Sequence, residues 1–570
     1  MSLFRWKSRP SPEPQEVVEL KKRFRFHAFL CILCGIMLGF SFPPSELGVL
    51  VCFGLVPLLI VLSDIDSIGT SLRYSYLAFF PFHLITLNWT GGYEHGNDPY
   101  MMLAGAITMI IHPIFYFIPI GAYVFVKKYL GGRVALLALP FLWVAYEYTH
   151  SLSEWSFPWL TIGNSQSYDD ARIQFITWTG VYGISFWILI INALAFLLYS
   201  KLAQRLWLPN SFRSVAMAGL IILVYLLPSV HGWIVLANAP TKEDLSNLVG
   251  GNTITVGMVQ SNVDPWEKWK VNGYQAVEFY LNITRAMVDQ SKDNPPDLVL
   301  WPETAIPVYL ITARHRTALE RLRAVIDSLG VPVLTGLPHA VFYDDTTKAP
   351  PSAKRIKETG ERYDAFNAAA FIQPGIEEVP WYGKMKMVPL AERVPYADAF
   401  YFLDVLRWGV GIGGWQIGPD TVIFRETKTG ARFCTMICYE STYPAFVAAF
   451  VRKGAEFISI ITIDSWWGRM SGAFQHHQYA IFRAVENRRW IARCAVGGMS
   501  SYIDPYGRVY DKTELFTQAT LVRTIGRSNE LTYYSEHGDL FSEVCLILAG
   551  LFVAGGTGQK FKNRSRLLSG

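Results

Sequence analysis

Charged residues are scarce in this chain of 570 residues. Asp, Glu, Lys and Arg make up 17% of the sequence, whereas soluble domains average roughly 25%. Hydrophobic residues reach 51%, and the mean hydropathy is positive, at +0.22. This deficit of charge indicates membrane spans before any single segment is considered. The net charge of +5 is too small to indicate a nucleic-acid partner.

Cysteines are also few, and their spacing gives no disulfide framework. The sequence holds seven, an odd number, so we expect at least one free thiol. Cys31 and Cys34 form a C-x-x-C motif, but the sequence around them is apolar throughout and has no βαβ context. We interpret this pair as small apolar residues of a lipid-embedded helix rather than as a redox or metal site.

A signal-peptide cleavage site is absent as well. The basic N-terminal segment leads directly into apolar sequence, and no small-residue site separates it from the next hydrophobic run. We therefore expect the first span to stay attached and to act as an anchor.

Long apolar runs fill the chain from about residue 25 to 238. The clearest spans are 101–126, 174–200 and 214–236, each long enough to cross about 30 Å of hydrocarbon. Runs with the same pattern lie at 24–42, 47–63 and 73–90, and two weaker runs lie at 134–148 and 540–558. For the two weaker runs, of which one contains a proline and the other is rich in glycine, a core helix is the alternative.

Lys and Arg are distributed unevenly between these runs. They are concentrated at both ends of the chain and in every second connection between successive apolar runs. The connections 42–47 and 91–100 contain none, and 149–173 contains only one. Basic residues accumulate in cytoplasmic loops. Eight spans with both termini in the cytoplasm would place every segment rich in Lys and Arg on the cytoplasmic side and every segment poor in them on the other side. The region between the seventh and eighth spans is then outside the cytoplasm, which in a bacterium means the periplasm.

These observations divide the chain into five parts. The predicted order is a basic cytoplasmic N-terminus (1–25), seven transmembrane helices (26–238), a periplasmic catalytic domain (250–535), an eighth transmembrane helix (540–558) and a basic cytoplasmic tail (559–570). Charged residues are spread throughout 250–535, as in an ordinary globular domain.

Within 250–535, short β-type runs alternate with helical stretches. The candidate strands are 253–260, 297–301, 331–336, 367–372, 432–438, 456–462, 490–496 and 500–505, and the candidate helices are about 270–292, 313–329, 443–453 and 474–489. This alternation predicts a layered α/β domain. Catalytic groups are expected at the strand ends and on the loops that follow them.

Three segments place reactive side chains at such positions. Glu303 follows the strand in DLVLWPETAIP, Lys384 precedes a loop in WYGKMKMVPLAERVPY, and Cys438 ends the strand in CTMICYESTYP. A cysteine thiol with a pKa of about 8.5 needs a base or a cationic neighbour at neutral pH. A buried glutamate can act as that base, and a lysine with a backbone N–H, here that of Tyr439, stabilises an oxyanion. Each of these residues alone has an ordinary structural explanation. The prediction of a catalytic site depends on finding all three, each at a strand–loop junction of the same domain.

The same three segments resemble the nitrilase superfamily, whose triad consists of Glu, Lys and Cys. A nitrilase domain placed between about seven spans and a final one is similar to the apolipoprotein N-acyltransferases, and the likeness covers nearly the whole chain. The resemblance implies a multi-span α-helical membrane domain plus an α/β nitrilase-like αββα sandwich domain. It implies Glu303 as the general base, Lys384 as the oxyanion stabiliser and Cys438 as the acyl-bearing nucleophile. The supporting residues that it implies are Glu392 as a second acid, Tyr439 and Glu440 after the nucleophile, Trp269 and Trp466 at the pocket, and Asn367.

The chain departs from the family pattern at three places, and at one of them Leu390 and Ala391 replace the Phe-Gly before the second glutamate. Lys386 stands where the family has a histidine, so two lysines compete for the catalytic role. The spacing to Glu392 favours Lys384. Ile463 and Asp464 replace the usual Asn-Asp pair, so we expect the acyl pocket to differ in shape.

Two other segments contain residues typical of ligand sites. His476 and His477 are adjacent, so they do not share a helix face for a metal ion. The glycine-rich segment 408–419 lacks the context of a phosphate loop and indicates either a mobile apolar lid or a plain linker. The resemblance implies that no metal and no organic cofactor is required.

The resemblance implies a reaction in two steps. Cys438 attacks an ester of a membrane phospholipid and forms a thioester, and the amino group of the diacylglyceryl-cysteine of an apolipoprotein then takes the acyl chain. We expect a monomer in the inner membrane of a bacterium. Two alternatives remain open: a membrane-anchored amidase or nitrilase acting on a small amide or nitrile, and a transporter or lipid-binding protein with an inactive nitrilase-like domain.

Overall fold

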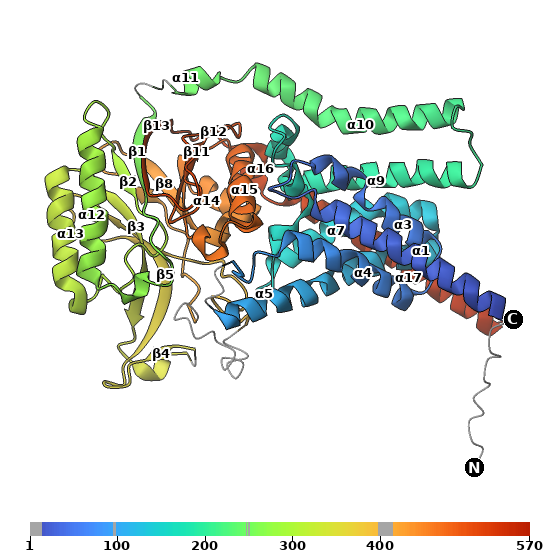
Figure 1. Ribbon diagram of the computed structural model, residues 1–570, viewed down its shortest axis with the longest axis horizontal. Helices are drawn as coiled ribbons and strands as arrows, with labels where there is room; N and C mark the ends of the chain where they lie inside the picture. The colour runs from blue at the N-terminus through green and yellow to red at the C-terminus, as the bar shows by residue number, and fades with distance from the viewer. Residues whose placement is uncertain are drawn as a thin grey trace, which may run out of the picture.

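The computed structural model describes residues 14–94, 98–246, 248, 251–350, 352–396 and 414–569. A bundle of long helices and an α/β domain lie at opposite ends of the molecule (Figure 1). The outer ends of α1 (Pro14–Gly39) and α17 (Leu540–Ser569) lie where the bundle is farthest from the α/β domain (Figure 1). The expected combination of a helical region with a layered α/β domain is confirmed. Residues 408–413, the first half of the glycine-rich segment 408–419, lie outside the described residues.

Long helices occupy most of the predicted spans. Besides α1 and α17, they are α4 (Ile68–Thr86), α5 (Pro99–Ile111), α6 (Phe117–Leu130), α7 (Gly132–Leu152), α9 (Val181–Ala203) and α10 (Phe212–Ala237). The run 47–63 forms only the short helices α2 (Val51–Gly54) and α3 (Val56–Ser63) after a single helical turn. Among the described residues, the helical stretches long and apolar enough to cross a membrane are Pro99–Leu130, Val181–Ala203, Phe212–Ala237 and Leu540–Leu567. The eight-span topology therefore stays a prediction.

Several boundaries differ from those predicted. α9 begins at Val181 rather than near residue 174, because Gly180, with a φ of +63°, interrupts the helix. α17 continues past residue 558 through the basic tail to Ser569. The weak run 134–148 lies inside the longer helix α7, which contains Pro140 without ending there.

Two sheets pack face to face in the α/β domain. Their strands are β1 (Thr253–Gln260), β2 (Leu298–Leu300), β3 (Val333–Phe342), β4 (Lys354–Arg355), β5 (Arg362–Ile372), β6 (Trp381–Gly383), β7 (Phe424–Arg425), β8 (Arg432–Ile437), β9 (Phe457–Thr462), β10 (Ile491–Ala495), β11 (Ser501–Ile503), β12 (Val509–Tyr510) and β13 (Ala519–Gly526). The first sheet has the order β13-β1-β2-β3-β5-β4 with β6 beside β5, and the second has the order β12-β11-β10-β9-β8-β7. β1, β2 and β3 are parallel, as are β8, β9 and β10. These central strands are almost entirely buried, as strands covered on both faces must be.

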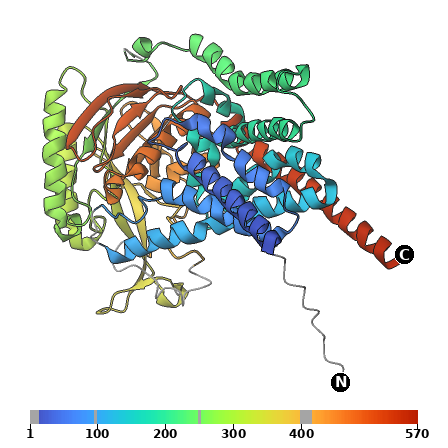
Figure 2. The same cartoon turned by 45° about the vertical axis from the view of Figure 1, so that its right-hand side comes forward.

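Helices cover the outer face of each sheet. The outer helices are α12 (Gly273–Gln290), α13 (Arg316–Leu329), α14 (Pro444–Arg452) and α15 (Ser471–Asn487). α12 and α13 lie on the first sheet, whereas α14 and α15 lie between the second sheet and the bundle (Figures 1 and 2). α12 begins after Asn272, whose side chain accepts a backbone N–H of the first turn. α13 ends at Gly330, whose φ is +64°. The αββα arrangement is therefore confirmed.

Gln475 of α15 joins the α/β domain to the bundle. Its Oε1 accepts hydrogen bonds from the indole N–H groups of Trp89, at 3.0 Å, and Trp159, at 2.6 Å. Its Nε2 donates to the carbonyl oxygens of Pro43, at 2.9 Å, and Thr86, at 3.1 Å. Because these four hydrogen bonds are buried, breaking any of them leaves an unsatisfied polar group. The second sheet is thus held firmly against the helical region.

Candidate active site

Cys438 lies at a sharp turn between β8 and α14. Its φ is +54°, a left-handed conformation that few residues other than glycine adopt. That conformation costs about 1–2 kcal/mol and turns the residue out of the strand ladder. The side chain is 8% exposed. A strained residue at the end of a buried strand is typical of a nucleophile presented by its backbone.

Lys384, which follows β6, is fully buried and lies beside two carboxylates. Its Nζ is 2.8 Å from Oε1 of Glu392 and 3.7 Å from Oε1 of Glu303. Burial alone lowers the pKa of Lys384, but Glu392 and Glu303 outweigh that effect and raise the pKa above its ordinary value. Lys384 is therefore positively charged at neutral pH, which is what oxyanion stabilisation requires.

Glu303, which follows β2, is held by one donor from each sheet. Its Oε1 accepts a hydrogen bond from Nδ2 of Asn367, on β5, at 2.8 Å. Its Oε2 accepts the backbone N–H of Ile463, which follows β9, at 3.1 Å. The carboxylate is buried between the two sheets.

Glu392 is the direct counter-ion of Lys384. One of its oxygens accepts from the lysine, and the other accepts the backbone N–H of Val388 at 2.9 Å. Both oxygens of Glu392 are thus engaged, whereas Glu303 lies beyond hydrogen-bond distance of the lysine. The two carboxylates therefore differ in their contact with the lysine, and the role of Glu303 as general base stays a prediction.

The thiol of Cys438 is neutral at rest. Burial raises its pKa above the ordinary value, the charge of Glu303 raises the pKa further, and the charge of Lys384 opposes them. A thiol in such surroundings needs a nearby base before it can act as a nucleophile. A buried thiol with a carboxylate and a lysine close enough to shift its pKa is suited to nucleophilic acyl transfer.

The side chain of Glu440 connects the segment around Lys384 to the turn at Cys438 through hydrogen bonds. Its Oε1 accepts hydrogen bonds from the hydroxyl of Tyr382 and the backbone N–H of Met385, both at 2.6 Å. Its Oε2 accepts the backbone N–H of Ile437 at 2.8 Å. Burial raises the pKa of Glu440 to about 7. The role that these contacts indicate is positional, because they connect the segments that carry the lysine and the nucleophile.

Tyr439 and Tyr443 connect the turn to the helical region. The Tyr439 hydroxyl donates to the carbonyl oxygen of Ser156 at 3.0 Å. The Tyr443 hydroxyl lies 2.6 Å from Oγ of Ser156. The ring of Trp159 stacks on Tyr439, with centroids 6.3 Å apart. The turn therefore packs directly on the segment between α7 and α9.

Comparisons with known proteins show the family to which the chain belongs. Residues 34–194 match the apolipoprotein N-acyltransferase N-terminal domain, and residues 255–530 match the carbon-nitrogen hydrolase family. The apolipoprotein N-acyltransferase of Chlorobaculum tepidum is 33% identical over 537 residues, which cover 92% of this chain and 95% of that protein. The chain belongs to the apolipoprotein N-acyltransferase family. It is thus a membrane protein and an acyltransferase, and lipoprotein N-acylation is the general activity that its family membership supports.

Two further proteins illustrate the extent of the similarity. The apolipoprotein N-acyltransferase of Geobacter metallireducens is 27% identical over 92% of this chain and 94% of its own length. The solved structure of a mutant of the amidase from Nesterenkonia sp. AN1 aligns with 51% of this chain and 96% of that protein, with 16% identity and a TM-score of 0.35. The similarity to the acyltransferases thus extends over both parts of the chain.

Lys384 and Lys386 have different surroundings in this family member. The Nζ of Lys386 lies over the rings of Tyr443, at 5.1 Å, and Phe446, at 5.8 Å. Its side chain is half-buried, and burial lowers its pKa. The structure therefore places Lys384, and not Lys386, against the paired carboxylates Glu303 and Glu392.

Replacing Lys384 with methionine is expected to slow acyl transfer by about 100- to 1,000-fold, the usual effect of losing one oxyanion donor. The same substitution also leaves two buried carboxylates without their cation, so the Tm should fall. Lys386→Met is the matched control and should stay within a few-fold of the wild type. Single-turnover rates and Tm values of the two variants provide the comparison. A larger loss of rate in Lys386→Met would exchange the roles of the two lysines.

The two predicted pocket tryptophans are half-buried. Trp466 lies edge-on against Trp266, with centroids 4.7 Å apart. Trp269 lies beneath the Nζ of Lys268, at 5.1 Å from the ring centroid. The aromatic partner of Trp466 is therefore Trp266, and the role of both predicted residues in the acyl pocket stays a prediction.

Lys268 is a buried residue of the site that the sequence does not reveal. Its ammonium group donates to the hydroxyl of Thr304, the residue after Glu303. Burial lowers the pKa of Lys268 to about 7, although the charge of Glu303 opposes that shift. In the sequence WEKWK, this lysine resembles its exposed neighbour Lys270, and no local signal distinguishes the two.

Lys268 should make the stability of the folded protein depend on pH. The unfolded lysine keeps its proton up to its ordinary pKa near 10.5, whereas the folded lysine loses it near 7. The unfolded state therefore binds more protons between pH 7 and 10.5, so stability should rise with pH in that window. We expect the Tm of the wild type to gain several degrees relative to Lys268→Met between pH 7 and 9. If the Tm of the wild type and the Tm of Lys268→Met changed equally with pH, this prediction would be wrong.

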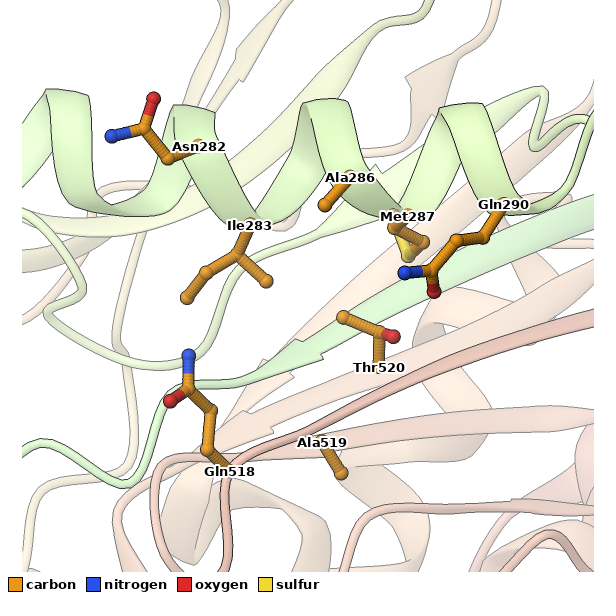
Figure 3. Close-up of a pocket in the computed structure, with 8 residues that line it drawn as sticks. All are labelled: Asn282, Ile283, Ala286, Met287, Gln290, Gln518, Ala519 and Thr520. Atoms are coloured by element: carbon orange, nitrogen blue, oxygen red, sulfur yellow. The ribbon is translucent and has the colours of Figure 1, made fainter.

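A shallow depression on the outside of the α/β domain lies apart from these residues (Figure 3). It has a volume of about 420 Å³ and lies between α12 and β13. Its lining residues are Asn282, Ile283, Ala286, Met287, Gln290, Gln518, Ala519 and Thr520. None of these side chains ionises or acts as a general acid or base, so the depression provides no catalytic group.

Proposed function

We propose that this acyltransferase moves an acyl chain from a membrane phospholipid, through a thioester on Cys438, to the N-terminal amino group of the diacylglyceryl-cysteine of apolipoproteins. The observation that carries the proposal is the set formed by Glu303, Lys384 and Glu392 around a buried cysteine. The cysteine is at a left-handed turn that packs on the helical region. Family membership supports the choice of lipoproteins as acceptors.

In the first step, Glu303 accepts the proton of the Cys438 thiol, and the sulfur attacks the carbonyl carbon of an acyl ester of the phospholipid. The Lys384 ammonium and the backbone N–H of Tyr439 stabilise the resulting oxyanion. The carbon–oxygen bond then breaks, and the departing lysophospholipid oxygen takes the proton from Glu303. The acyl chain is left on the sulfur as a thioester.

In the second step, the amino group of the apolipoprotein attacks the thioester carbon. Glu303 accepts a proton from that nitrogen, and the carbon–sulfur bond breaks as the amide forms. The thiolate then takes the proton from Glu303, which returns Cys438 to its neutral resting state. Because the two substrates use one site in turn, the kinetics should be ping-pong.

We propose eight spans with both termini in the cytoplasm of a bacterium, a monomeric protein in the inner membrane, and the catalytic domain in the periplasm. The concentration of basic residues at the two chain ends supports this orientation. So does the position of the outer ends of α1 and α17, which lie at the end of the bundle remote from the α/β domain (Figure 1).

The proposal can be tested with purified wild-type protein and a phospholipid labelled in its sn-1 acyl chain. We expect a labelled adduct that neutral hydroxylamine releases, and mass spectrometry should locate it on the peptide that contains Cys438. A diacylglyceryl-cysteine peptide added next should take up the label as a hydroxylamine-stable amide. The absence of an adduct, together with hydrolysis of small amides, would instead support a membrane-anchored amidase.

A further inference from the structure

The carbonyl group of Cys438 is held by two buried side chains that the reaction steps above do not use. Oγ of Ser441 donates to this carbonyl oxygen at 2.9 Å. Nε2 of His476, on α15, lies 3.0 Å from the same oxygen. Because Cys438 has a left-handed conformation, its carbonyl points away from the strand ladder and needs partners of this kind.

His476 is itself held in one orientation by a chain of buried groups. Its Nδ1 lies 2.8 Å from Oδ1 of Asp464, and Oδ2 of Asp464 accepts from Nη2 of Arg493 at 2.7 Å. All three side chains are 0% exposed. Although burial raises the pKa of Asp464, the charges of Arg493 and His476 outweigh it and hold the pKa below its ordinary value. Asp464 is therefore ionised, and Nη2 of Arg493 also lies 3.1 Å from Nδ1 of His476.

Ser441, His476 and Asp464 have the connectivity of a serine hydrolase triad, but their geometry excludes that role. The serine is 1% exposed, and its hydroxyl donates to the carbonyl of Cys438. A serine nucleophile must instead face a substrate and give its proton to the histidine. Nε2 of His476 lies 2.9 Å from Oγ of Ser441 and 3.0 Å from the carbonyl oxygen of Cys438, but the buried serine does not face a substrate.

The carbonyl oxygen of Cys438 and the N–H of Tyr439 belong to the same peptide unit. In a planar trans peptide these two groups point in opposite directions, so fixing the carbonyl also fixes the N–H. Hydrogen bonds to the carbonyl oxygen also polarise the amide and strengthen its N–H as a donor. Ser441 and His476 thus act on the peptide whose N–H is the oxyanion donor in the proposed reaction.

We propose that His476, held by Asp464 and Arg493, positions the peptide between Cys438 and Tyr439 so that its N–H completes the oxyanion site. This inference rests on the proposed thioester chemistry. His476 is a positioning residue, because it acts through the peptide and does not contact the substrate. Ser441 is its partner on the same carbonyl oxygen.

His476→Leu tests the inference, and His477→Leu is a matched control. His477 is the next residue of α15, is equally buried and contacts Oγ of Ser501 instead of the turn. We expect the single-turnover acylation rate at saturating phospholipid to fall about 10- to 100-fold more in His476→Leu than in His477→Leu. The phospholipid concentration for half-maximal rate should not change. His476→Gln, which keeps a donor group, should recover part of the rate.

Ser441→Ala provides a second measurement, because it removes the other donor with little change in volume. We expect a loss of about tenfold in the same rate constant. The inference is overturned if Ser441→Ala and His476→Gln react at the wild-type rate, or if the two leucine variants lose the same activity. If the wild type itself forms no acyl adduct, the proposed function fails rather than the positioning role.

Discussion

Replacing Cys438 with alanine is expected to abolish the acyl adduct, with a loss of at least about 10⁴-fold in its rate of formation. The thiol is the group that would carry the acyl chain, and alanine has no atom that can form the thioester. The neighbouring hydroxyl of Ser441 is buried and already donates to the carbonyl of Cys438. The measurement is the label retained by the protein after incubation with labelled phospholipid and removal of lipid.

Cys434→Ala is the control for this prediction. Cys434 lies on β8, the same strand that leads to Cys438, and is fully buried. Its replacement removes one packed sulfur atom, at a cost on the order of 1 kcal/mol, and should leave the adduct intact. Label that persists in Cys438→Ala, or that disappears equally from both variants, would show that this thiol is not the acyl carrier.

The central strands of the α/β domain are well predicted from the sequence. The apolar run 253–260 coincides with β1, because a strand buried on both faces needs an apolar side chain at nearly every position. β13 was not predicted, since its residues are mostly half-buried and include Arg523. It forms a strand because it pairs with β1 along its whole length. β5 also begins at Arg362, before the predicted 367, because it continues a hairpin with β3.

The sequence predicts the residues of the site as three separate motifs. Which of these residues contact one another is determined by the fold. Family resemblance selects Lys384, and the structure explains the choice by its distances to Glu392 and Glu303. Lys268 and His476 were not predicted as site residues. His476 lies 38 residues from Cys438 in sequence, and the contact exists only because α15 packs beneath the turn. Buried polar contacts between distant segments leave no local periodicity in the sequence.

Replacing Glu303 with glutamine is expected to slow acylation by about 10³-fold, within the range measured for general bases. Glutamine is nearly isosteric, and its oxygen can still accept the hydrogen bond from Asn367. It cannot accept the proton of the thiol, however, and the thiol of Cys438 is neutral at rest because burial raises its pKa. The amount of acyl adduct formed at each time after mixing gives the rate.

Glu426→Gln is the control for the loss of a buried carboxylate. Glu426 is 1% exposed and accepts backbone N–H groups of the turn at Lys428 and Thr429, outside the site. Its replacement should lower the Tm and leave the acylation rate unchanged. Equal rates in Glu303→Gln and the wild type would mean that another group deprotonates the thiol.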